Sequence, residues 1–265
     1  MNTADDPSMK SKKTPLAPVL EVVNLSHRFM DGTEALREIT LSFKAGELVL
    51  ITGKNGSGKT TLVRHLNGLL SPSTGEVRLM GAPIAKSLKN ARRRVGMVFQ
   101  DADSQIVGET VWDDTIFGPE NLKWKRDRID RQAAEVLSAV GLREQYGQAP
   151  HTLSGGEKRR LAIAGVLAMD PAVIVFDEPF SNLDYPGVCQ VLSQLVALRE
   201  QGRTLIVITH DVEKVVAHAD RIVVMEAGRV VRDGVPSQVL PGIGRYGVRE
   251  PCASLMGREI PSWLS

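Results

Sequence analysis

The stretch Gly53-Lys54-Asn55-Gly56-Ser57-Gly58-Lys59-Thr60 decides the fold. It fits the pattern Gly-x-x-x-x-Gly-Lys-[Ser/Thr] and lies between an apolar segment at 47–52 and a helical pattern at 59–70. Glycines let successive backbone N–H groups point at one anion, and the start of the helix adds its dipole. Lys59 can reach the β- and γ-phosphates of a nucleotide, and the Thr60 hydroxyl can bind Mg²⁺. The stretch therefore predicts a nucleoside-triphosphate loop built from Gly53, Asn55, Gly56, Ser57, Gly58, Lys59, Thr60 and Thr61.

Short apolar runs alternate with helical patterns along most of the chain. Strands are predicted at 19–25, 39–43, 47–52, 75–79, 95–99, 172–176, 204–209, 221–225 and 229–232. Helices are predicted at 59–70, 127–140, 155–169 and 187–200. Strands that alternate with helices are typical of a parallel α/β sheet. A polar, helix-rich part at about 100–168 is expected to be inserted into this α/β fold.

The composition is that of an ordinary soluble globular protein. The formal net charge of +2 gives no basis for a nucleic-acid partner. No apolar run approaches the roughly 18 residues that a membrane span needs. Cys189 and Cys252 lack the spacing of a metal site and are expected to be reduced thiols. Residues 1–17 have no apolar stretch, so we expect a disordered tail and no secretory signal.

Two carboxylates, Asp177 and Glu178, directly follow the apolar segment at 172–176. A buried parallel strand would place them at its carboxyl end, where ligands bind in open α/β sheets. Asp177 suits a Mg²⁺ ligand, and Glu178 suits the base that polarises the attacking water. Two solvated acids at a strand end are the alternative, but the phosphate loop favours the functional interpretation.

A second possible anion site, Leu153-Ser154-Gly155-Gly156-Glu157, opens the predicted helix at 155–169. Ser154 and Glu157 have the spacing of a capping box, which is a structural explanation of the pattern. A serine and glycine amides at a helix N-terminus also form a phosphate-binding surface. Because the loop at 53–60 already surrounds the phosphates from one side, this second surface has no phosphate to bind unless it faces another chain.

With these motifs the sequence resembles the ATP-binding-cassette (ABC) ATPases over about residues 19–239. The segment at 153–157 is similar to their Leu-Ser-Gly-Gly-Gln signature, with Glu157 in place of Gln. The resemblance implies an α/β P-loop NTPase core with an antiparallel β subdomain and an inserted α-helical subdomain. This ABC ATPase domain would span 18–242, and a tail would follow at 243–265. It also implies ATP hydrolysis with Mg²⁺ by a head-to-tail homo- or heterodimer, whose sites pair the loop of one chain with Ser154, Gly155 and Gly156 of the other.

Four further positions match landmarks of the same family in order. Gln100 resembles the Q-loop glutamine, which contacts Mg²⁺ and water. Asp184 ends Ser-Asn-Leu-Asp, which resembles the Ser-Ala-Leu-Asp of the D-loop at the dimer interface. His210 resembles the switch histidine that contacts the γ-phosphate. Phe29 stands where the family places an aromatic residue, usually Tyr, that stacks on adenine; a core Phe is the alternative. The preference for ATP over GTP therefore rests on the resemblance.

Two segments in the helical part resemble the ATPases of energy-coupling-factor (ECF) importers. These ATPases commonly contain Gln-Asn-Pro-Asp-x-Gln and Phe-Gly-Pro-x-Asn-Leu, and the chain has Gln-Asp-Ala-Asp-Ser-Gln at 100–105 and Phe-Gly-Pro-Glu-Asn at 117–121. Asp101-Ala102 replaces the usual Asn-Pro. The resemblance implies an ATPase at the cytoplasmic face of the membrane that drives uptake of a vitamin, Ni²⁺ or Co²⁺ through a coupling subunit and a substrate-binding membrane subunit.

Other classes fit the motifs less well or remain open. A P-loop kinase or GTPase would need a substrate lid or an Asn-Lys-x-Asp that reads guanine, and the sequence has neither. It would also leave the segment at 153–157 without a role. An ATPase of another ABC importer, and a non-transport ABC regulator that switches a protein partner, stay open as alternatives.

Overall fold

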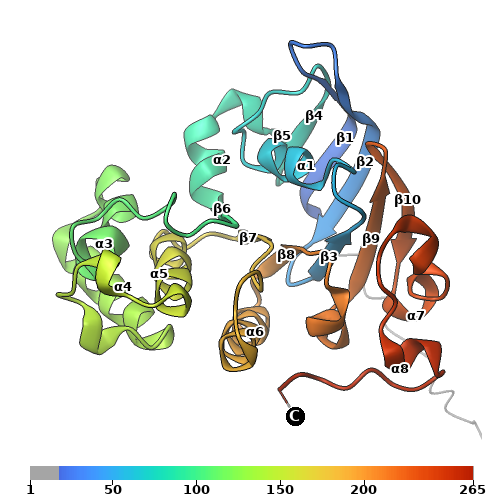
Figure 1. The fold of residues 1–265 in the computed structure, drawn as a ribbon. Coiled ribbons are helices and arrows are strands. Elements are labelled where there is room, and N and C mark those ends of the chain that lie inside the picture. Colours follow the sequence, from blue (N-terminus) through green and yellow to red (C-terminus); the bar gives the residue numbers. More distant parts are fainter. Residues whose placement is uncertain (1–17, 265) are drawn as a thin grey trace, which may run out of the picture.

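The computed structural model describes residues 18–264. In these residues ten strands form two sheets, and eight α-helices pack around them (Figure 1). The tail expected at 1–17 lies outside these residues. The larger sheet has the strand order β10-β9-β3-β8-β7-β6. Its pairs are parallel except for β9 and β10, as the alternation of strands and helices predicts. The strands span β3 (Leu48–Thr52), β6 (Val95–Val98), β7 (Val173–Asp177), β8 (Thr204–Ile208), β9 (Arg221–Glu226) and β10 (Arg229–Gly234).

The central strands are covered on both faces. In β3 every residue is buried, with Leu48 and Leu50 in one core cluster and Val49 and Ile51 in the other. Alternate side chains of a strand point to opposite faces, so a strand between two packed layers is apolar throughout. Helix α6 (Tyr185–Glu200) contributes to the first cluster, and α1 (Lys59–Leu66) contributes to the second. The strand that leads into the phosphate loop is therefore held from both sides.

The second sheet is antiparallel and packs over α1, which confirms the expected β subdomain. Its strands follow the order β2-β1-β4-β5. They span β1 (Pro18–Arg28), β2 (Glu34–Lys44), β4 (Thr74–Leu79) and β5 (Ala82–Pro83). The first two strands are longer than the apolar runs that predicted them, because their solvent-side residues are polar. Helix α1 ends before the expected residue 70, since Gly68 takes a positive φ of 72° just past its end.

The inserted part contains α3 (Val111–Asn121), α4 (Arg126–Ala139) and α5 (Gly155–Leu167), which form the left end of the molecule in Figure 1. Helix α3 was not predicted, since Gly118 and Pro119 interrupt its pattern. Gly118 has a packing reason, because a Cβ there would lie 2.8 Å from the Met169 sulfur. A short α2 (Leu88–Arg94) was missed as well. No helix of the described residues has the length and apolarity for a transmembrane span.

The segment after Pro241 packs on the chain's own body, an arrangement that the sequence did not indicate. Ile243 and Val248 are buried in the first core cluster. The Trp263 ring lies 5.6 Å from the Tyr185 ring between centroids, and its backbone carbonyl accepts from the Tyr185 hydroxyl at 3.4 Å and the Cys189 thiol at 3.3 Å. The last described residues thus lie beside the start of α6. This segment includes α8 (Cys252–Leu255) and follows α7 (Pro236–Val239).

Candidate nucleotide site

The loop between β3 and α1 has a geometry that only glycine permits at two positions. Gly53 has a φ of 144°, and a Cβ there would lie 2.2 Å from the Met225 carbonyl oxygen. Gly58 has a φ of 101°, and its Cβ would lie 2.8 Å from the Ala35 carbonyl oxygen. At both positions the backbone has a positive φ, and a Cβ would collide with the main chain of another segment. The loop is consequently packed against the main chains of β9 at Met225 and β2 at Ala35.

The polar groups of this loop are arranged for an anion. Lys59 is 7% exposed, and its ammonium donates to the carbonyls of Gly53 at 2.7 Å and Lys54 at 3.0 Å. Burial lowers the pKa of Lys59, and the carboxylates of Glu178 and Asp177 oppose that shift. The buried Ser57 hydroxyl has no hydrogen-bond partner among the described residues. An orphaned buried hydroxyl is costly, so this loop suits an incoming oxyanion.

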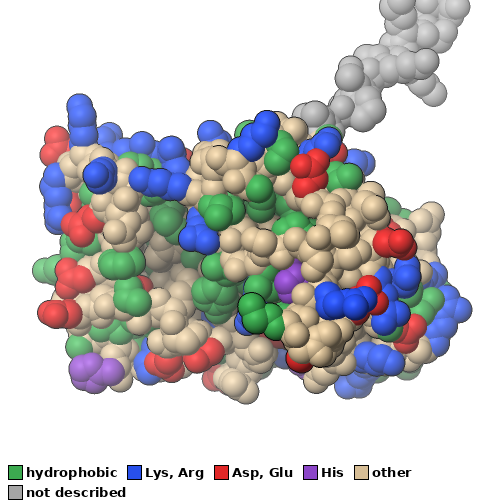
Figure 2. All heavy atoms as spheres, turned by 90° about the horizontal axis from the view of Figure 1, so that it is seen from above, with side chains coloured by type: hydrophobic (Ala, Val, Ile, Leu, Met, Phe, Trp, Pro, Cys, Tyr) green, Lys and Arg blue, Asp and Glu red, His purple; other side chains and the backbone are tan. Residues whose placement is uncertain are grey.

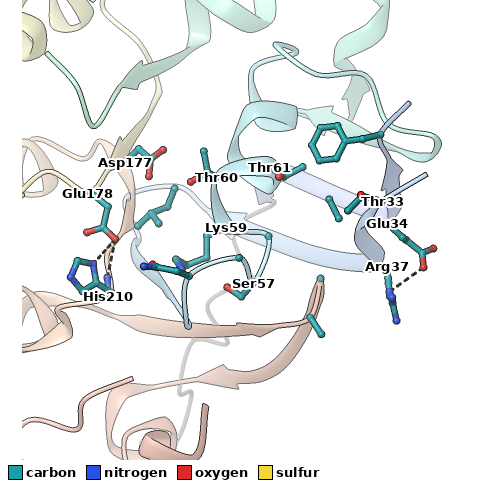
Figure 3. Close-up of a pocket in the computed structure, with 18 of the residues that line it drawn as sticks. Thr33, Glu34, Arg37, Ser57, Lys59, Thr60, Thr61, Asp177, Glu178 and His210 are labelled. Carbon is teal, nitrogen blue, oxygen red and sulfur yellow. Dashed lines mark hydrogen bonds and ion pairs between the residues drawn. The ribbon is translucent and has the colours of Figure 1, made fainter. Parts of the chain in front are cut away.

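The two acids predicted from the sequence stand at the mouth of the loop. Asp177 ends β7 and is buried, and its side chain is hydrogen-bonded to Thr60. Burial and then the neighbouring Glu178 raise the pKa of Asp177, against the Thr60 hydrogen bond. Glu178 has a φ of 48°, and its amide donates to the Ile208 carbonyl at 2.9 Å. This turn aims the two adjacent carboxylates in different directions (Figure 3).

Glu178 is joined to the predicted switch histidine. Its Oε1 accepts from the His210 amide at 3.1 Å and lies 2.8 Å from the His210 Nδ1. Figure 3 shows the pair beside Lys59. The contact between the Glu178 carboxylate and the His210 imidazole thus joins the ends of β7 and β8. Both side chains line the pocket.

These residues line one pocket of about 780 Å³, a volume suited to a nucleotide. Phe29 lines it as well and is 41% exposed, so it is not a core residue. Gln100 reaches the same pocket from the end of β6. The structure therefore gathers most of the residues predicted from sequence, namely Phe29, Asn55, Gly56, Ser57, Gly58, Lys59, Thr60, Thr61, Gln100, Asp177, Glu178 and His210.

The pocket also has walls that the sequence did not reveal. Thr33, Glu34 and Arg37 come from the β1–β2 hairpin, and Gly228 comes from the β9–β10 turn. The Gly228 amide donates to the Ser57 carbonyl at 3.1 Å, and the Gly228 carbonyl accepts from the Arg37 amide at 2.9 Å. The β1–β2 hairpin and the β9–β10 turn are distant from the loop in the sequence and come close to it only in the folded chain. No motif or spacing links them to it in the sequence.

The segment at 153–157 lies outside this pocket, as does Asp184. Ser154 caps α5, and its hydroxyl accepts from the Glu157 amide at 3.3 Å. The Glu157 carboxylate in return accepts from the Ser154 amide at 2.8 Å and hydroxyl at 2.7 Å, which lowers the pKa of Glu157. Asp184 caps α6 by accepting from the Gly187 amide at 3.0 Å. Ser154, Gly155, Gly156 and Asp184 therefore do not meet the phosphate loop of their own chain.

Helix α5 is bound to the segment that carries Gln100. The Arg159 guanidinium, 5% exposed, donates to the Phe99 carbonyl at 2.7 Å. The Gln105 amide group accepts from the Phe99 N–H at 2.9 Å and donates to the Ala162 carbonyl at 3.3 Å. Lys158 forms an ion pair with Asp103 at 2.6 Å. These contacts couple the helix that begins at residue 155 to the segment that carries Gln100, and no sequence pattern pointed to Arg159 in this role.

A groove of about 500 Å³ opens between α2, β6 and the helices α3 and α5. Phe117 and Met97 contribute apolar surface, Asp114 lies in its lining, and Lys89, Arg92 and Arg93 stand along α2. In Figure 2 the molecule is seen from above, and a hollow separates the helical end on the left from the rest. The segment at 117–121, singled out by sequence, thus lies on this groove.

Comparison with known proteins agrees with the fold and the pocket. A family model described as ABC transporter matches residues 36–181. The chain is 43% identical over 228 residues, which are 85% of this chain and 82% of the relative, to the energy-coupling factor transporter ATP-binding protein EcfA of Methanocaldococcus jannaschii. It is also 43% identical to the EcfA of Methanosarcina acetivorans, over 86% of this chain and 84% of the relative.

Among solved structures, cbiO1 from Clostridium perfringens, part of the ABC transporter complex cbiONQ, superimposes with a TM-score of 0.79. Its sequence identity is 37%, and the match covers 91% of this chain and 99% of that one. The chain belongs to the ABC transporter family, as one of its ATP-binding subunits that hydrolyse ATP. Within that family it is similar to the ATP-binding proteins of energy-coupling factor transporters.

Proposed function

We propose that this chain is the ATPase of an ECF-type importer and works as a head-to-tail dimer on the cytoplasmic face of a membrane. The dimer is supported by one observation, that the predicted ATP-binding residues fall into two groups that lie apart in a single chain. Loop, acids and His210 share one pocket, whereas Ser154, Gly155 and Gly156 lie outside it with a capped helix N-terminus. Such an N-terminus binds anions, and the family arrangement supplies one from the facing chain.

In each half-site the chain's own residues take distinct roles. Lys59 leaves the two loop carbonyls and pairs with the β- and γ-phosphates, while the orphaned Ser57 hydroxyl donates to the nucleotide. Glu178 accepts the proton of the attacking water, and His210 holds the Glu178 carboxylate in place and faces the γ-phosphate. The Phe29 face stacks on the adenine ring. Asp184 and the Ser154 amide region close the site across the dimer.

The residues present also fit a magnesium ion that arrives with the nucleotide. The Asp177 carboxyl and the Thr60 hydroxyl are already paired, and Gln100 lines the same pocket, so three oxygen donors face one space. Mg²⁺ keeps much of its water and needs only one or two carboxylates besides the phosphates. Consistent with that, no cluster of three His, Cys, Asp or Glu residues occurs in the described part of the chain. The ion would neutralise charge on the phosphates.

The groove beside α2 and α3 suits the membrane coupling subunit. It is apolar at Phe117 and Met97 and has polar residues along its edge, as expected for a helix-in-groove contact. The contacts of Arg159 and Gln105 connect this region to Gln100, so a change at the nucleotide reaches the groove through packed residues. The cargo, a vitamin, Ni²⁺ or Co²⁺ delivered by a substrate-binding membrane subunit, rests on the family resemblance alone.

Glu178→Gln tests the catalytic assignment. The variant keeps the size of the side chain but cannot accept a proton, so ATP binding measured by calorimetry should be retained and ATP turnover should fall by on the order of 100-fold or more. Glu200→Gln, at the exposed end of α6 and outside the pocket, serves as a control with normal turnover. Retained hydrolysis in Glu178→Gln would remove Glu178 from the base role.

Copurification separates importer from regulator. Isolation of the tagged chain from membranes should yield an integral membrane protein, and the identity of any substrate-binding subunit would name the cargo. If only soluble partners are recovered, the non-transport regulator becomes the better explanation. If the membrane partner is of another importer class, the ATPase role stands and the ECF assignment is wrong.

A further inference from the structure

Two histidines lie directly behind the pocket wall at Phe29. His27 is 8% exposed and His65 is fully buried. The His27 ring meets the Phe29 ring edge to face, with centroids 4.7 Å apart and planes at 85°. On its other side His27 meets the His65 ring at 4.7 Å, and the His27 Nδ1 lies 3.2 Å from the His65 Nε2. Since His27 and Phe29 are two positions apart, an extended strand places them on the same face.

The contacts of the neutral pair fix which nitrogens carry protons. The His65 Nδ1 lies 2.8 Å from the Thr61 carbonyl, which only accepts, so Nδ1 bears the hydrogen and Nε2 is an acceptor. The His27 Nδ1 faces both that Nε2 and the Ser71 carbonyl at 3.2 Å, so it must donate. The His27 Nε2 then keeps a lone pair that is buried without a partner among the described residues.

This arrangement forms a continuous chain of contacts. It begins at the Phe29 ring, passes through His27 and His65, and ends at Thr61 in the first turn of α1. Thr61 also lines the nucleotide pocket. Burial lowers the pKa of His65, which favours the neutral form that these contacts need. Apolar side chains would fill the same space without leaving a buried nitrogen unsatisfied, so packing alone does not account for the pair.

We propose that His27 is a positioning residue, which holds the Phe29 ring at the angle needed for stacking on the nucleotide base and is itself anchored by His65. The proposal rests on the proposed function in one respect, that Phe29 contacts the base. Phe29 is exposed, and its backbone, which is bonded to Thr33 and Gly32 in the hairpin, does not set the angle of the ring. The edge of His27 restricts rotation of that ring. Through His65 the base platform is linked to the helix that follows the phosphate loop.

Two variants of His27 separate its two contacts. His27→Asn keeps an N–H donor near the position of Nδ1 but removes the ring that touches Phe29. His27→Phe keeps an aromatic edge against Phe29 but removes the donor to His65. Binding of adenylyl imidodiphosphate and of inorganic tripolyphosphate, both with Mg²⁺, is measured by calorimetry for each variant. The second ligand has no base, so its affinity reports the phosphate loop and the integrity of the fold.

We expect His27→Asn to weaken binding of the adenine nucleotide by about 2- to 12-fold, the range for one aromatic pair, and to leave tripolyphosphate unchanged. His27→Phe should retain nucleotide binding within about two-fold of the wild type. His65→Leu removes the same hydrogen bond as His27→Phe and leaves the His27 ring against Phe29, so it should behave as His27→Phe does. In the double variant with Phe29→Ala, His27→Asn should add nothing further, because its effect acts through that ring.

The outcomes distinguish the contact of Phe29 with the base from the positioning role of His27. If Phe29→Ala alone leaves nucleotide binding unchanged, the base contact in the proposed function is wrong. If Phe29→Ala weakens binding but His27→Asn does not, only the positioning role is overturned. An equal loss of affinity for tripolyphosphate in His27→Asn, or additive effects in the double variant, would also overturn it, since either result places the effect on the phosphate loop or the fold.

Discussion

Replacing Arg159 with Met tests how the helix that begins at Gly155 is connected to Gln100. Met fills the space of the aliphatic stem and removes the guanidinium that donates to the Phe99 carbonyl at 2.7 Å. A lost hydrogen bond from a charged donor costs about 1.5–3 kcal/mol. Burial lowers the pKa of Arg159, which means that the cation itself is desolvated at a cost, and Met relieves this cost. The balance is a destabilisation of about 1–2 kcal/mol, or roughly 2–8 °C in Tm.

The effect on activity follows from the position of Phe99. Its carbonyl belongs to the peptide that leads into Gln100, so loss of the anchor lets Gln100 shift relative to Asp177 and the nucleotide. A misplacement of about 1 Å can cost up to about 100-fold in rate, and we expect kcat for ATP hydrolysis to fall by on the order of 10-fold with KM little changed. Urea unfolding and steady-state ATPase assays measure the two effects.

Arg160→Met provides the matched control, because Arg160 is the next residue of α5 and its guanidinium donates to the Gln190 side chain of α6 at 2.6 Å instead of to Phe99. Its stability and turnover should stay close to those of the wild type. If Arg159→Met unfolds at the same urea concentration as Arg160→Met and keeps its kcat, then α5 and the Gln100 segment are not coupled through this guanidinium.

Three further predictions concern the loop, the buried histidine and the chain end. Gly53→Ala should abolish nucleotide binding in calorimetry, because its Cβ would collide with the Met225 carbonyl at 2.2 Å, whereas Gly56→Ala meets no atom within 4 Å and should cost only about 1–2 kcal/mol for its positive φ. The pKa of His65 is lowered from 6.5, so the unfolded chain binds more protons and stability falls as pH drops below about 6.5. Urea midpoints between pH 5 and 8 should show that loss in the wild type and less of it in His65→Leu. Trp263→Ala should lower the free energy of unfolding by about 0.5–1.5 kcal/mol, the value of its contact with Tyr185, and an unchanged Tm would contradict a docked chain end.

Local chemistry made the phosphate half of the pocket predictable. Gly53, Gly58 and Lys59 are needed within one short loop, so their spacing in the sequence is their spacing in space. Asp177 and Glu178 could be placed because a buried parallel strand brings its carboxyl end to the edge where ligands bind, whereas His210 was placed by its resemblance to the switch histidine. The alternation of strands and helices predicted the parallel pairing of the larger sheet, and the polar, helix-rich part at about 100–168 predicted the helical insertion.

The remainder depended on contacts between distant segments. Gly228 reaches the loop through a main-chain hydrogen bond to Ser57, and Arg37 is joined to Gly228 by another, so neither contact leaves a side-chain pattern in the sequence. Arg159 looked like one more cation on a helix, and only its burial identifies it. Helix α3 was missed because Gly118 lowers helix propensity locally, while its contact with Met169 stabilises it in the folded chain.

Trp263 is bound to α6 by two kinds of contact, through its main-chain oxygen and through its ring, and these two contacts constrain the sequence differently. The bonds from Tyr185 and Cys189 reach a main-chain oxygen of residue 263, which every amino acid provides, so substitutions there leave them intact. They depend instead on the number of residues after α8, and a single insertion or deletion would carry that oxygen away. The ring contact has the opposite character, since it depends on an aromatic residue at 263. Among homologous chains, the length of this segment should therefore drift less than its composition.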